Sequence, residues 1–407
     1  MKIAIWHNLH SGGASRALQY HIQGLVENGH EVEVWANSPD AEGFMKLPTN
    51  VKLHKVALNL SNEQPTFSER MDSLFFNKDA NMRAMIEHCQ ECVSEIKEGN
   101  FEVLFAHSCY LYAAPFIARY LDIPSVLYLH EPNRYLYEAM PRQVWSAPER
   151  ILNKLSPKFW IYFFSDLWRT HKLRVYVREE QINFQAFDKV LVNSYFSMES
   201  CKRAYGLNSE VCYLGIDNSL FKPAESKKQE SYVIGLGGFM KHKNQELAIR
   251  AIAEIKEKRP KLIWVGNLVD EDYYQAMQDL AQSLKVELEL KKMVADDYLV
   301  TLLSGATCMI YSSNLEPFGF APLEANACGT PVVAIAEGGL RETIIHGKNG
   351  FLTNPNPVEM ANCIQQLVEN QELRNEMAKF SIQNVQQKWT LKQCSERINN
   401  AIQSVIL

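Results

Sequence analysis

Residues 2–35 read KIAIWHNLHSGGASRALQYHIQGLVENGHEVEVW, and this stretch decides the fold class. Lys2–His7 is a short apolar run that predicts a strand, and Gly12-Gly13 predicts a turn after it. Apolar side chains recur at helical spacing from Ala14 to Glu27, and Val32–Trp35 begins a second strand. A strand, a helix and a strand in this order predict a parallel, doubly wound α/β sheet, which binds ligands at the carboxyl ends of its strands.

Strands and helices alternate along most of the remaining chain, in two series separated by a polar stretch at 222–230. Two successive series of this kind predict two Rossmann-like domains that face each other across a cleft. Further strands of the first series are predicted at Val103–Ala106, Ser125–Leu129 and Lys189–Asn193. Those of the second are predicted at Val233–Leu236, Leu262–Val265, Glu287–Leu290, Cys308–Tyr311 and Pro331–Ile335.

Composition excludes several classes of protein. With 46% hydrophobic and 22% charged residues, the 407-residue chain has the make-up of a globular protein. Its net charge of -5 argues against a nucleic-acid partner, which usually meets a basic surface. The nine cysteines are scattered, and Cys89-x-x-Cys92 has no second pair at zinc spacing, so we expect packed thiols in the reducing cytoplasm. No run reaches the ~20 apolar residues that span a bilayer, which leaves open a peripheral position on the inner face of the membrane.

Residues 141–178 depart from the α/β pattern. The aromatic run Phe159–Phe164 is followed by Leu167-Trp168, and eight basic residues against two acidic ones give the region a net charge of +6. Basic and aromatic side chains together suit an anionic membrane surface or a lipid-linked substrate. A helical hairpin that packs its aromatic side chains on its own domain explains the pattern equally well. The charged residues are Arg142, Glu149, Arg150, Lys154, Lys158, Asp166, Arg169, Lys172, Arg174 and Arg178.

The most informative stretch for chemistry is Ser312–Gly329. It reads as a loop after a strand, then a short helix from about Pro322 to Cys328 that Gly329 ends. The loop and the helix start present free main-chain N–H groups, a natural site for the anionic oxygens of a diphosphate. Those N–H groups belong to Phe318, Gly319 and Phe320.

Two carboxylates frame this loop. Glu316 lies within the loop, where it can accept hydrogen bonds from sugar hydroxyls, and Glu324 lies in the predicted first turn, where it can accept both hydroxyls of a ribose. The alternative is that both acids are stabilised by the helix dipole, by ~0.3–1 kcal/mol each. That alternative accounts for Glu324 but not for Glu316, which stands before a Pro-Phe-Gly turn.

The run EPFGFAPLEANACGTPVVA at 316–334 resembles the E-x7-E signature of the family-four retaining glycosyltransferases, which have the GT-B fold. The resemblance covers nearly the whole chain, because other segments agree in order and spacing. They are Gly12-Gly13-Ala14 with Gly29-His30-Glu31-Val32, Asn193-Ser194 through Gly206 to Gly215-Ile216-Asp217 with Phe221-Lys222-Pro223, and Gly338-Gly339-Leu340-Arg341-Glu342 with Gly347-Lys348-Asn349-Gly350.

This resemblance implies a domain plan. Residues 1–215 form an N-terminal Rossmann-like acceptor domain, with 141–178 as a helical insertion. Residues 216–389 form the C-terminal domain that binds the nucleotide-sugar donor, and a helix within 390–407 returns to the N-terminal domain.

The resemblance also assigns roles to single residues. The expected catalytic residues are His130, which contacts the donor sugar, Lys243, which holds phosphate oxygens, and Glu316, which binds sugar hydroxyls. Arg16 and Arg134 are placed on the acceptor side, although a salt bridge within its own loop explains Arg134 equally well. The other residues expected around the donor are Gly12, Gly13, Gly238, Lys241, the main chain of Met293 and Val294, Phe318, Gly319, Phe320 and, at the ribose, Glu324.

One position departs from the family pattern. The family has an arginine five residues before the lysine, and here Gly238 stands in that place before Lys243. The charge of the leaving diphosphate then needs another cation, for which Lys241 and Arg16 are the candidates.

The implied reaction is transfer of a hexose with retention of configuration, without a metal or another cofactor. The segments His130–Tyr137 and Lys241–Asn244 look closest to O-antigen type mannosyltransferases, which favours GDP-mannose as donor, with UDP-hexoses as the alternative. The expected acceptor is a glycan or a polyisoprenoid-linked glycan. Asp270-Glu271-Asp272 could be mistaken for a metal-binding D-x-D, but its context predicts the acidic first turn of a helix.

Other functions remain open for the same architecture. One is a sugar phosphorylase or a nucleotide-sugar epimerase of GT-B fold. Another is a non-catalytic nucleotide-sugar binder, which Gly238 favours because it replaces the family's arginine.

Overall fold

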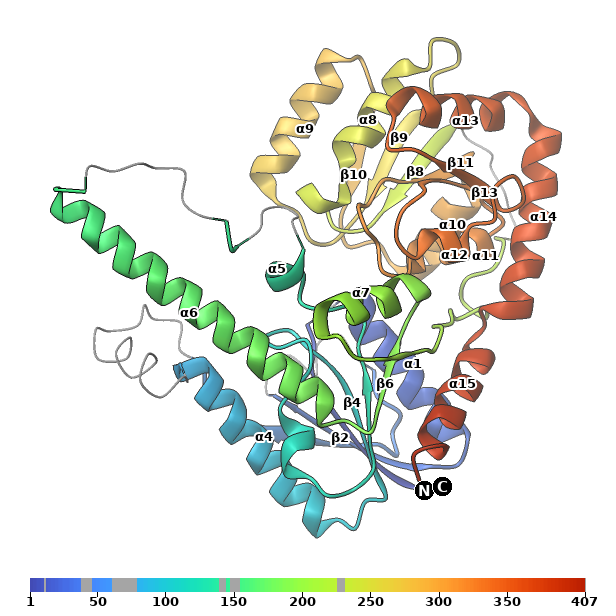
Figure 1. Ribbon diagram of the computed structural model, residues 1–407. Helices are drawn as coiled ribbons and strands as arrows, with labels where there is room; N and C mark the ends of the chain where they lie inside the picture. The colour runs from blue at the N-terminus through green and yellow to red at the C-terminus, as the bar shows by residue number, and fades with distance from the viewer. Residues whose placement is uncertain are drawn as a thin grey trace. The chain divides into compact units, whose positions relative to one another are not determined.

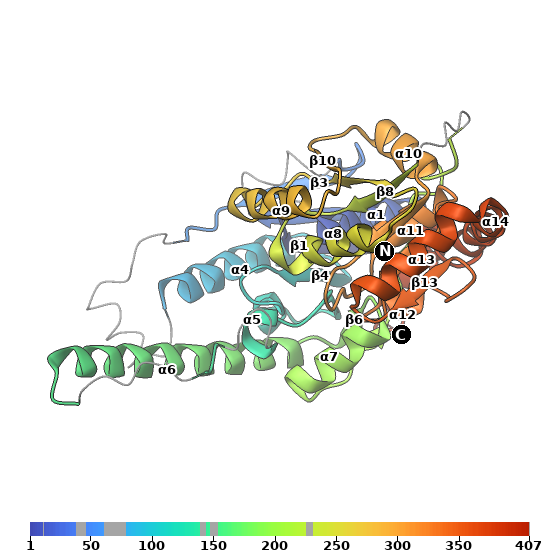
Figure 2. The same ribbon diagram turned by 90° about the horizontal axis from the view of Figure 1, so that it is seen from above.

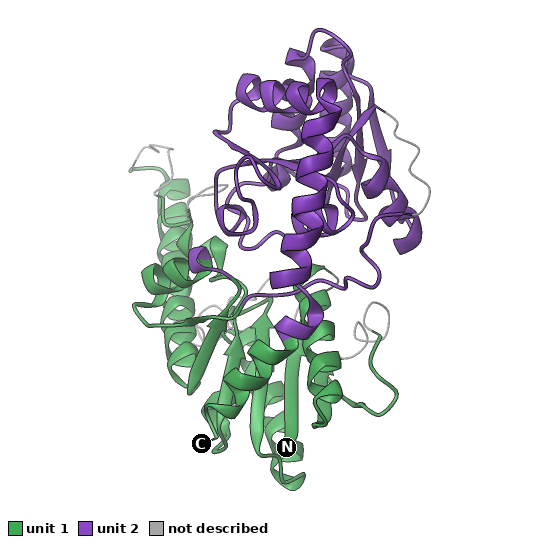
Figure 3. Cartoon of the chain, turned by 90° about the vertical axis from the view of Figure 1, so that its right-hand side faces the viewer, with its two compact units in different colours: residues 1–193, 197–212, 395–407 green, residues 194–196, 213–394 purple. Residues whose placement is uncertain are grey.

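The computed structural model describes residues 1–10, 12–37, 46–60, 79–138, 144–146, 154–224 and 231–406. The chain divides into two compact units, drawn in separate colours in Figure 3. Unit 1 comprises Met1–Asn193, Ser197–Cys212 and Ser395–Leu407, and unit 2 comprises Ser194–Phe196 and Tyr213–Cys394. Each unit is built on one parallel sheet with helices packed on it, which confirms the predicted pair of Rossmann-like folds.

Within the described residues, unit 1 has a sheet of seven parallel strands in the order β3-β2-β1-β4-β5-β6-β7. The central strand β1 pairs with β2 on one side and with β4 on the other, so the order reverses between β1 and β4. The strands are β1 Lys2–Asn8, β2 Glu31–Asn37, β3 Lys52–Val56, β4 Val103–Cys109, β5 Ser125–Tyr128, β6 Lys189–Val192 and β7 Glu210–Val211.

The helices of unit 1 connect these strands as crossovers (Figure 1). They are α1 Gly13–Glu27, α4 Ala80–Glu98, the 3-10 helix η1 Ile117–Tyr120, α5 Arg134–Tyr137, α6 Pro157–Gln185 and α7 Tyr195–Tyr205. The last helix of the chain is α15 Leu391–Gln403, and its part from Ser395 onward belongs to unit 1.

Helix α15 is fixed to α1 by close packing and hydrogen bonds. A Cβ atom on Gly24 of α1 would lie 2.5 Å from Ser395 Oγ, so a glycine is needed where the helices meet. Asn28 Nδ2 donates to Ser395 Oγ at 2.6 Å, and His30 Nε2 lies 2.7 Å from Asn399 Oδ1. The C-terminal helix is therefore part of the N-terminal fold.

Unit 2 has, in the described ranges, a sheet of six parallel strands in the order β10-β9-β8-β11-β12-β13. Its order reverses between β8 and β11. The strands are β8 Tyr232–Leu236, β9 Lys261–Val265, β10 Leu288–Lys291, β11 Cys308–Tyr311, β12 Val332–Ile335 and β13 Gly350–Thr353. The helices are η2 Lys241–Lys243 (3-10), α8 Gln245–Glu254, α9 Glu271–Ser283, α10 Asp296–Gly305, α11 Phe320–Ala327, α12 Leu340–Thr343, α13 Pro357–Glu369 and α14 Gln371–Lys388.

Three strands were not expected from the sequence. Strand β3 has only one buried residue, Val56, and β7 is two residues long, so neither carries a clear apolar run. Strand β13 begins with Gly350, whose missing side chain hides the pattern. A Cβ atom there would lie 2.1 Å from the carbonyl oxygen of Val332, so the close pairing of β12 and β13 requires glycine.

The aromatic run lies on one long helix. Helix α6 runs unbroken from Pro157 to Gln185, and Trp160, Phe163 and Phe164 are about half exposed or more. The hairpin was one of two alternatives raised from sequence, and most of the stretch before α6 that would form its other arm lies outside the described residues. Arg142, Glu149 and Arg150 lie outside the described residues.

The cysteines behave as packed thiols, as predicted. Cys89 and Cys92 are fully buried on α4, and none of the nine cysteines, all of them described, forms a disulfide. Burial raises the pKa of the Cys89 thiol well above its usual range, which keeps the thiol protonated.

Candidate active site

The candidate site in unit 2 lies where the strand order reverses. Strands β8 and β11 are neighbours at that point, and their carboxyl ends lead into two loops. The loop after β8 carries Lys243, and the loop after β11 carries Glu316. This is the position at which open parallel sheets bind their ligands.

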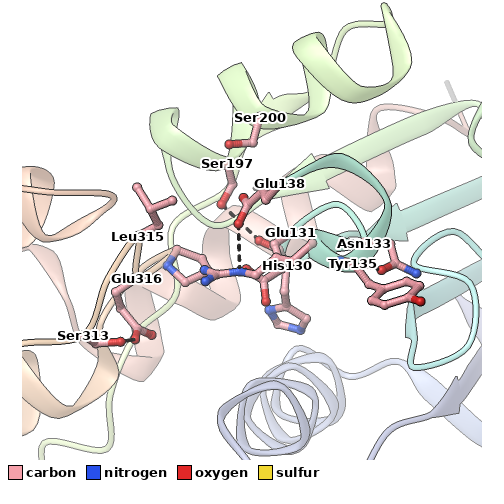
Figure 4. Close-up of polar contacts among 12 residues, drawn as sticks. His130, Glu131, Asn133, Tyr135, Glu138, Ser197, Ser200, Ser313, Leu315 and Glu316 are labelled. Carbon is pink, nitrogen blue, oxygen red and sulfur yellow. Dashed lines mark hydrogen bonds and ion pairs between the residues drawn. The ribbon is translucent and has the colours of Figure 1, made fainter. Parts of the chain in front are cut away.

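Glu316 and Lys243 meet directly. Lys243 Nζ donates to Glu316 Oε2 at 2.8 Å, and the hydroxyls of Tyr311 and Ser313 donate to the same oxygen at 3.0 Å each. Figure 4 shows Ser313 beside the carboxylate. All three bonds reach Oε2, so Oε1 receives no hydrogen bond from any described residue. One oxygen is thus fixed by the protein, and the other is left for a ligand.

The carboxylate is charged under ordinary conditions. Burial of Glu316 raises its pKa, but the charge of Lys243 and the three hydrogen bonds outweigh burial and lower the pKa to about 2. Its side chain is 16% exposed and that of Lys243 is 21% exposed, so the pair is largely shielded from solvent. The site therefore holds a preformed, partly desolvated ion pair.

Several long-range contacts fix the Glu316 loop. Ser312 Oγ donates to the carbonyl oxygen of Lys243 at 3.0 Å, which joins the two loops of the site. The N–H of Gly339 donates to the carbonyl oxygen of Glu316 at 2.8 Å. A Cβ atom on Gly338 would lie 2.2 Å from that same oxygen, so the pair of glycines lets the loop lie directly against the main chain after β12.

The loop also presents main-chain donors. Gly319 has φ 94 and precedes the first residue of α11, Phe320. The N–H groups of Phe318 and Gly319 donate to no acceptor in the described part of the chain. These amides stand next to Glu316 in the sequence, at a helix start that favours an anion.

The helix itself begins earlier than predicted. Helix α11 starts at Phe320 rather than at Pro322, because Gly319 adopts the left-handed conformation that ends the loop. Glu324 is therefore in the second turn, not the first, and its side chain is buried. Stabilisation by the helix dipole, the alternative raised from sequence, does not apply at that depth.

The remaining donor-side residues of unit 2 have mixed settings. Gly238 could carry a Cβ atom without a clash, since the nearest atoms to an added Cβ lie 3.4 Å away, in ordinary van der Waals contact. Lys241 is exposed in η2. Met293 has φ 52, and its N–H donates to Asn267 Oδ1 at 3.0 Å. The Met293 amide therefore already has an acceptor within the protein.

In unit 1, the glycines after β1 begin helix α1. Gly12 and Gly13 are exposed, and Gly12 has no neighbour within 4 Å of an added Cβ. Ser15 Oγ accepts from the N–H of Gly12 at 3.0 Å and donates to its carbonyl oxygen at 2.8 Å, which fixes the turn. Arg16 follows in the first turns of α1 and is half-buried.

His130 follows β5 and is held by its main chain. Its N–H donates to Ser108 Oγ at 3.0 Å. Its carbonyl oxygen accepts from Ser197 Oγ, also at 3.0 Å (Figure 4). Its ring lies against Tyr128 and His107, at centroid distances of 5.1 and 5.6 Å. Nε2 is buried and has no partner among the described residues.

A cluster of histidines, His7, His21, His107 and His130, lies around this position. His21 Nδ1 and His107 Nε2 are 3.2 Å apart, so one ring donates to the other. Burial lowers the pKa of His130 to about 4 and that of His21 to about 3, and it lowers the pKa of His107 well below its usual range. The cluster is therefore neutral at pH 7.

Two charged motifs have structural partners. Arg134 Nε donates to Glu131 Oε2 at 2.5 Å and lies 3.6 Å from Glu138, so the salt bridge raised from sequence is present. The predicted acidic helix start is present at α9, where Glu271 and Asp272 lie in the first turn. Asp270, predicted to lie in that turn, is instead the N-cap and accepts from the N–H of Tyr273. Within the described chain, no group of three or more His, Cys, Asp or Glu side chains is arranged to hold a metal ion.

The sequence missed the partners that set up the predicted residues. Tyr311 and Ser313 fix Glu316, while His107 and His21 surround His130. Tyr311 reads as the last residue of an apolar strand, and its hydroxyl was the only signal that it does more than pack. The glycine pair at Gly338-Gly339 was noted only as part of a motif.

The two halves of the chain match two family models. Residues 11–220 match Glycosyltransferase Family 4, and residues 217–384 match Glycosyl transferases group 1. The chain belongs to glycosyltransferase family 4. This family assignment agrees with the resemblance found in the sequence and with the paired Rossmann-like units.

Curated relatives are distant. Alpha-1,3/1,6-mannosyltransferase of Mus musculus is 23% identical over 245 residues, which cover 54% of this chain and 59% of that protein. Mannosylfructose-phosphate synthase of Agrobacterium fabrum is 22% identical over 303 residues, which cover 69% of this chain and 64% of that protein. The chain thus spans less than two thirds of the length of these two relatives.

Solved structures share the GT-B fold over almost the whole chain. Sucrose-phosphate synthase from Thermosynechococcus elongatus superposes with a TM-score of 0.76 at 16% identity, covering 99% of this chain and 98% of that one. The Anabaena protein HepE in complex with UDP-glucose gives a TM-score of 0.70 at 21% identity, covering 99% and 100%. At these identities the comparison establishes the fold of this glycosyltransferase family 4 member.

Proposed function

We propose that this protein is a retaining glycosyltransferase that moves a hexose from a nucleotide diphosphate sugar to a glycan or lipid-linked acceptor. The observation that carries the proposal is the environment of Glu316. Oε2 is held by Lys243, Tyr311 and Ser313, whereas Oε1 has no partner in the described chain. A charged oxygen left open beside a fixed one suits binding of sugar hydroxyls, because a charge-assisted hydrogen bond is about twice as strong as a neutral one.

The diphosphate is proposed to bind next to this carboxylate. Lys243 supplies a positive charge, and the N–H groups of Phe318 and Gly319 have no described acceptor of their own. Phe320, at the first position of α11, would add a third amide. Fixed donors of this kind stabilise an anion without reorganising as charge develops. Glu324 is proposed for the ribose, and the main chain of Met293 and Val294 for the base.

The residues proposed in unit 1 concern the transferred sugar and the acceptor. His130 would contact the donor sugar through Nε2, which is buried and lacks a described partner. Gly12 and Gly13 would allow close approach of the main chain to the donor, because neither bears a side chain. Arg16 is proposed on the acceptor side. Arg134 is proposed to act on the acceptor side indirectly, because its salt bridge with Glu131 stabilises the loop that both residues belong to.

The anomeric configuration is retained if the acceptor hydroxyl and the leaving diphosphate use the same face of the sugar. The acceptor hydroxyl would attack on the face from which the diphosphate leaves, so that the bond from the anomeric carbon to phosphate oxygen breaks as the bond to the acceptor oxygen forms. A phosphate oxygen would accept the acceptor's proton, and Lys243 and the amides would stabilise the charge on the leaving diphosphate. No metal or other cofactor enters this proposal.

Gly238 shapes how the leaving group is neutralised. With no side chain at this position, Lys243 and the exposed Lys241 are the cations that η2 offers to the diphosphate. We propose that they act together in the place of the expected arginine.

The proposed donor is GDP-mannose, with UDP-hexoses as the alternative. Support for mannose comes from relatives named as mannosyltransferase and mannosylfructose-phosphate synthase. Support for the alternative comes from the fold relative that was solved with UDP-glucose. The proposed acceptor is a polyisoprenoid-linked glycan, and the proposed second partner is an anionic membrane surface.

A thermal-shift screen with GDP, UDP, GDP-mannose and UDP-glucose tests the proposal first. Ligands that bind the folded state raise the melting temperature according to concentration over Kd. We expect one nucleotide series to stabilise the protein and the other to have little effect. No shift with any of the four at millimolar concentration would contradict a donor site.

Turnover then separates the alternatives. Incubation with the preferred nucleotide sugar should release nucleotide diphosphate through transfer or slow hydrolysis, and NMR of the released or transferred sugar should show the starting anomeric configuration. Activity that requires inorganic phosphate would indicate a phosphorylase, and an epimerised nucleotide sugar would indicate an epimerase. Binding with no turnover on any acceptor would indicate a non-catalytic binder.

A further inference from the structure

Helix α6 exposes apolar side chains all the way around its N-terminal half. The side chains of residues 160–164 and of Leu167 are between 48% and 68% exposed. Successive residues of an α-helix are rotated by about 100°, so five in a row point to every side. The ring contacts of Phe159–Phe164 within the described chain are all with one another. We call Phe159–Trp168 the apolar tip.

The other half of α6 is firmly attached to unit 1. Glu180 accepts from the N–H of Ala113 at 2.8 Å, and Asn183 Nδ2 donates to the carbonyl oxygen of Ala114 at 2.7 Å. Glu179 pairs with Arg119 at 2.7 Å. The direction of the helix is therefore set by the core of unit 1, and its tip extends past the sheet of that unit (Figures 1 and 2).

The distribution of exposed rings decides what kind of partner fits the tip. A protein groove covers one stripe of a helix, and a helix that docks in one carries its apolar residues on that stripe. The tip has no polar face, since its only charged residue is Asp166. A helix that is apolar on all sides matches a medium that surrounds it, which for a helix end is the interior of a bilayer.

Charge selects the type of bilayer. Next to the tip, Lys158 stands on one side and Arg169 and Arg174 on the other, and all three are exposed. Neither arginine forms an ion pair with a described carboxylate. Basic residues bordering an apolar segment with Trp and Tyr are the pattern of side chains that lie at anionic lipid headgroups.

Length sets the depth. At 1.5 Å per residue, Phe159–Trp168 is about 15 Å long. The hydrocarbon core of a bilayer is about 30 Å thick, so the tip reaches through about one leaflet. Among the helices that the structure describes, none has both the length and the apolar character needed to cross a bilayer.

We propose that the tip of α6 inserts into one leaflet of an anionic membrane, with Arg169 and Arg174, on the side of the tip nearer to unit 1, at the phosphates. The inference deepens the proposed membrane partner by naming the inserted residues. It does not rest on glycosyl transfer, because the tip contains none of the residues proposed to bind the donor. Insertion would hold unit 1 at the surface where a lipid-linked acceptor is embedded.

Sedimentation with vesicles of phosphatidylcholine, with and without 30% phosphatidylglycerol, tests the proposal in the absence of donor and acceptor. We expect the wild-type chain to bind the anionic vesicles. The double variant Phe163→Glu/Phe164→Glu should lower the partition coefficient at least tenfold, since it puts charges in hydrocarbon. Val358→Glu is the control, because Val358 is also exposed on a helix, at 51%. Turnover of the nucleotide sugar without vesicles should be unchanged in both variants.

Depth separates insertion from surface adsorption. Brominated lipids should quench the tryptophan fluorescence of the wild-type protein more than that of Trp160→Phe. Lipids that carry the bromine near the middle of the acyl chain should already produce this quenching. Equal quenching of the two proteins would overturn insertion. Insertion would also be overturned if 0.5 M NaCl abolished vesicle binding and if wild type and Phe163→Glu/Phe164→Glu then no longer differed. Sedimentation equilibrium measures the mass of the protein in solution. A wild-type dimer that the change Phe163→Glu/Phe164→Glu dissociates would show that a second copy covers the tip, and it would overturn the proposal.

Discussion

Glu316 in unit 2 and His130 in unit 1 are both half-buried and both follow the carboxyl end of a parallel strand, but the two units treat these polar groups in opposite ways. Glu316 is kept charged by Lys243 and two hydroxyls, with a pKa of about 2. His130 is kept neutral by burial among other rings, with a pKa of about 4, and its Nε2 has no described partner.

The difference indicates a division of labour. A fixed charge with one open oxygen suits the many hydroxyls and the phosphate charge of a donor, because it needs no reorganisation when the ligand binds. A neutral imidazole can accept or donate one hydrogen bond without adding charge beside an electron-poor sugar. Four changes test this comparison.

The largest effect is expected from Glu316→Gln. The amide keeps the shape but removes the charge, so the rate of transfer should fall roughly 10²–10³-fold, as for loss of one well-placed electrostatic contact. Nucleotide diphosphate should still bind, within about threefold of wild type by calorimetry. Glu246→Gln is the matched control, since its side chain is 47% exposed in the same unit. Normal turnover in Glu316→Gln would remove this residue from the site.

His130→Ala should have the next largest effect. Loss of one hydrogen bond to a buried ligand group costs about 1–3 kcal/mol, which is roughly a 5- to 150-fold reduction in kcat/KM. His346→Ala serves as the comparison, because that histidine is exposed and belongs to unit 2. An unaltered kcat/KM in His130→Ala would show that the open Nε2 has no role in turnover.

The two groups should also respond to pH in separate windows. The histidines have pKa values below the unfolded value of 6.5, so the unfolded chain binds more protons below pH 6.5. Stability should fall from pH 6.5 to about 4, by on the order of 3 kcal/mol for His130 alone. Glu316 acts lower: its stabilisation is present above pH 4.5 and is lost as pH falls towards about 2.

Urea unfolding at pH 7.0, 5.5 and 4.5 checks the first window. His21→Phe should flatten the slope, because it removes a histidine whose pKa is about 3 in the folded state. A free energy of unfolding that is constant from pH 7.0 to 4.5 would mean that the cluster is not neutral by burial.

The smallest effect is expected from Gly238→Arg, which adds the cation that the family pattern has at this place. An added Cβ there would make ordinary van der Waals contacts, and an arginine that solvent partly screens should lower the Kd for nucleotide diphosphate only about threefold to tenfold. Gly238→Gln is the control for size without charge. Equal Kd values in the two variants would show that Lys241 and Lys243 already neutralise the diphosphate.

The inner strands of the two sheets were predictable because they are buried on both faces, as β1 and β11 are. Cys308–Tyr311, for example, is a continuous apolar run that was assigned with the correct bounds. The strands that escaped prediction lack this signal: β3 has a single buried residue, and β13 begins with a glycine that close pairing requires.

The site was predictable only in part. Glu316, Lys243 and His130 could be named from motifs, but their partners depend on contacts far apart in the sequence. His21 reaches His107 only because α1 packs on β4, and Gly338 supports the Glu316 loop only because the chain after β12 returns beneath it. Such contacts follow from packing of the whole unit, which no local pattern reports.

The most direct test of the account is whether Glu316 distinguishes a nucleotide sugar from the bare nucleotide diphosphate. Calorimetric Kd values for GDP and GDP-mannose, or for UDP and UDP-glucose if that series is preferred, give the ratio for wild type and for Glu316→Gln. The account predicts that the variant loses affinity for the nucleotide sugar at least fivefold while its affinity for the diphosphate changes little. The same ratio in both proteins would contradict it.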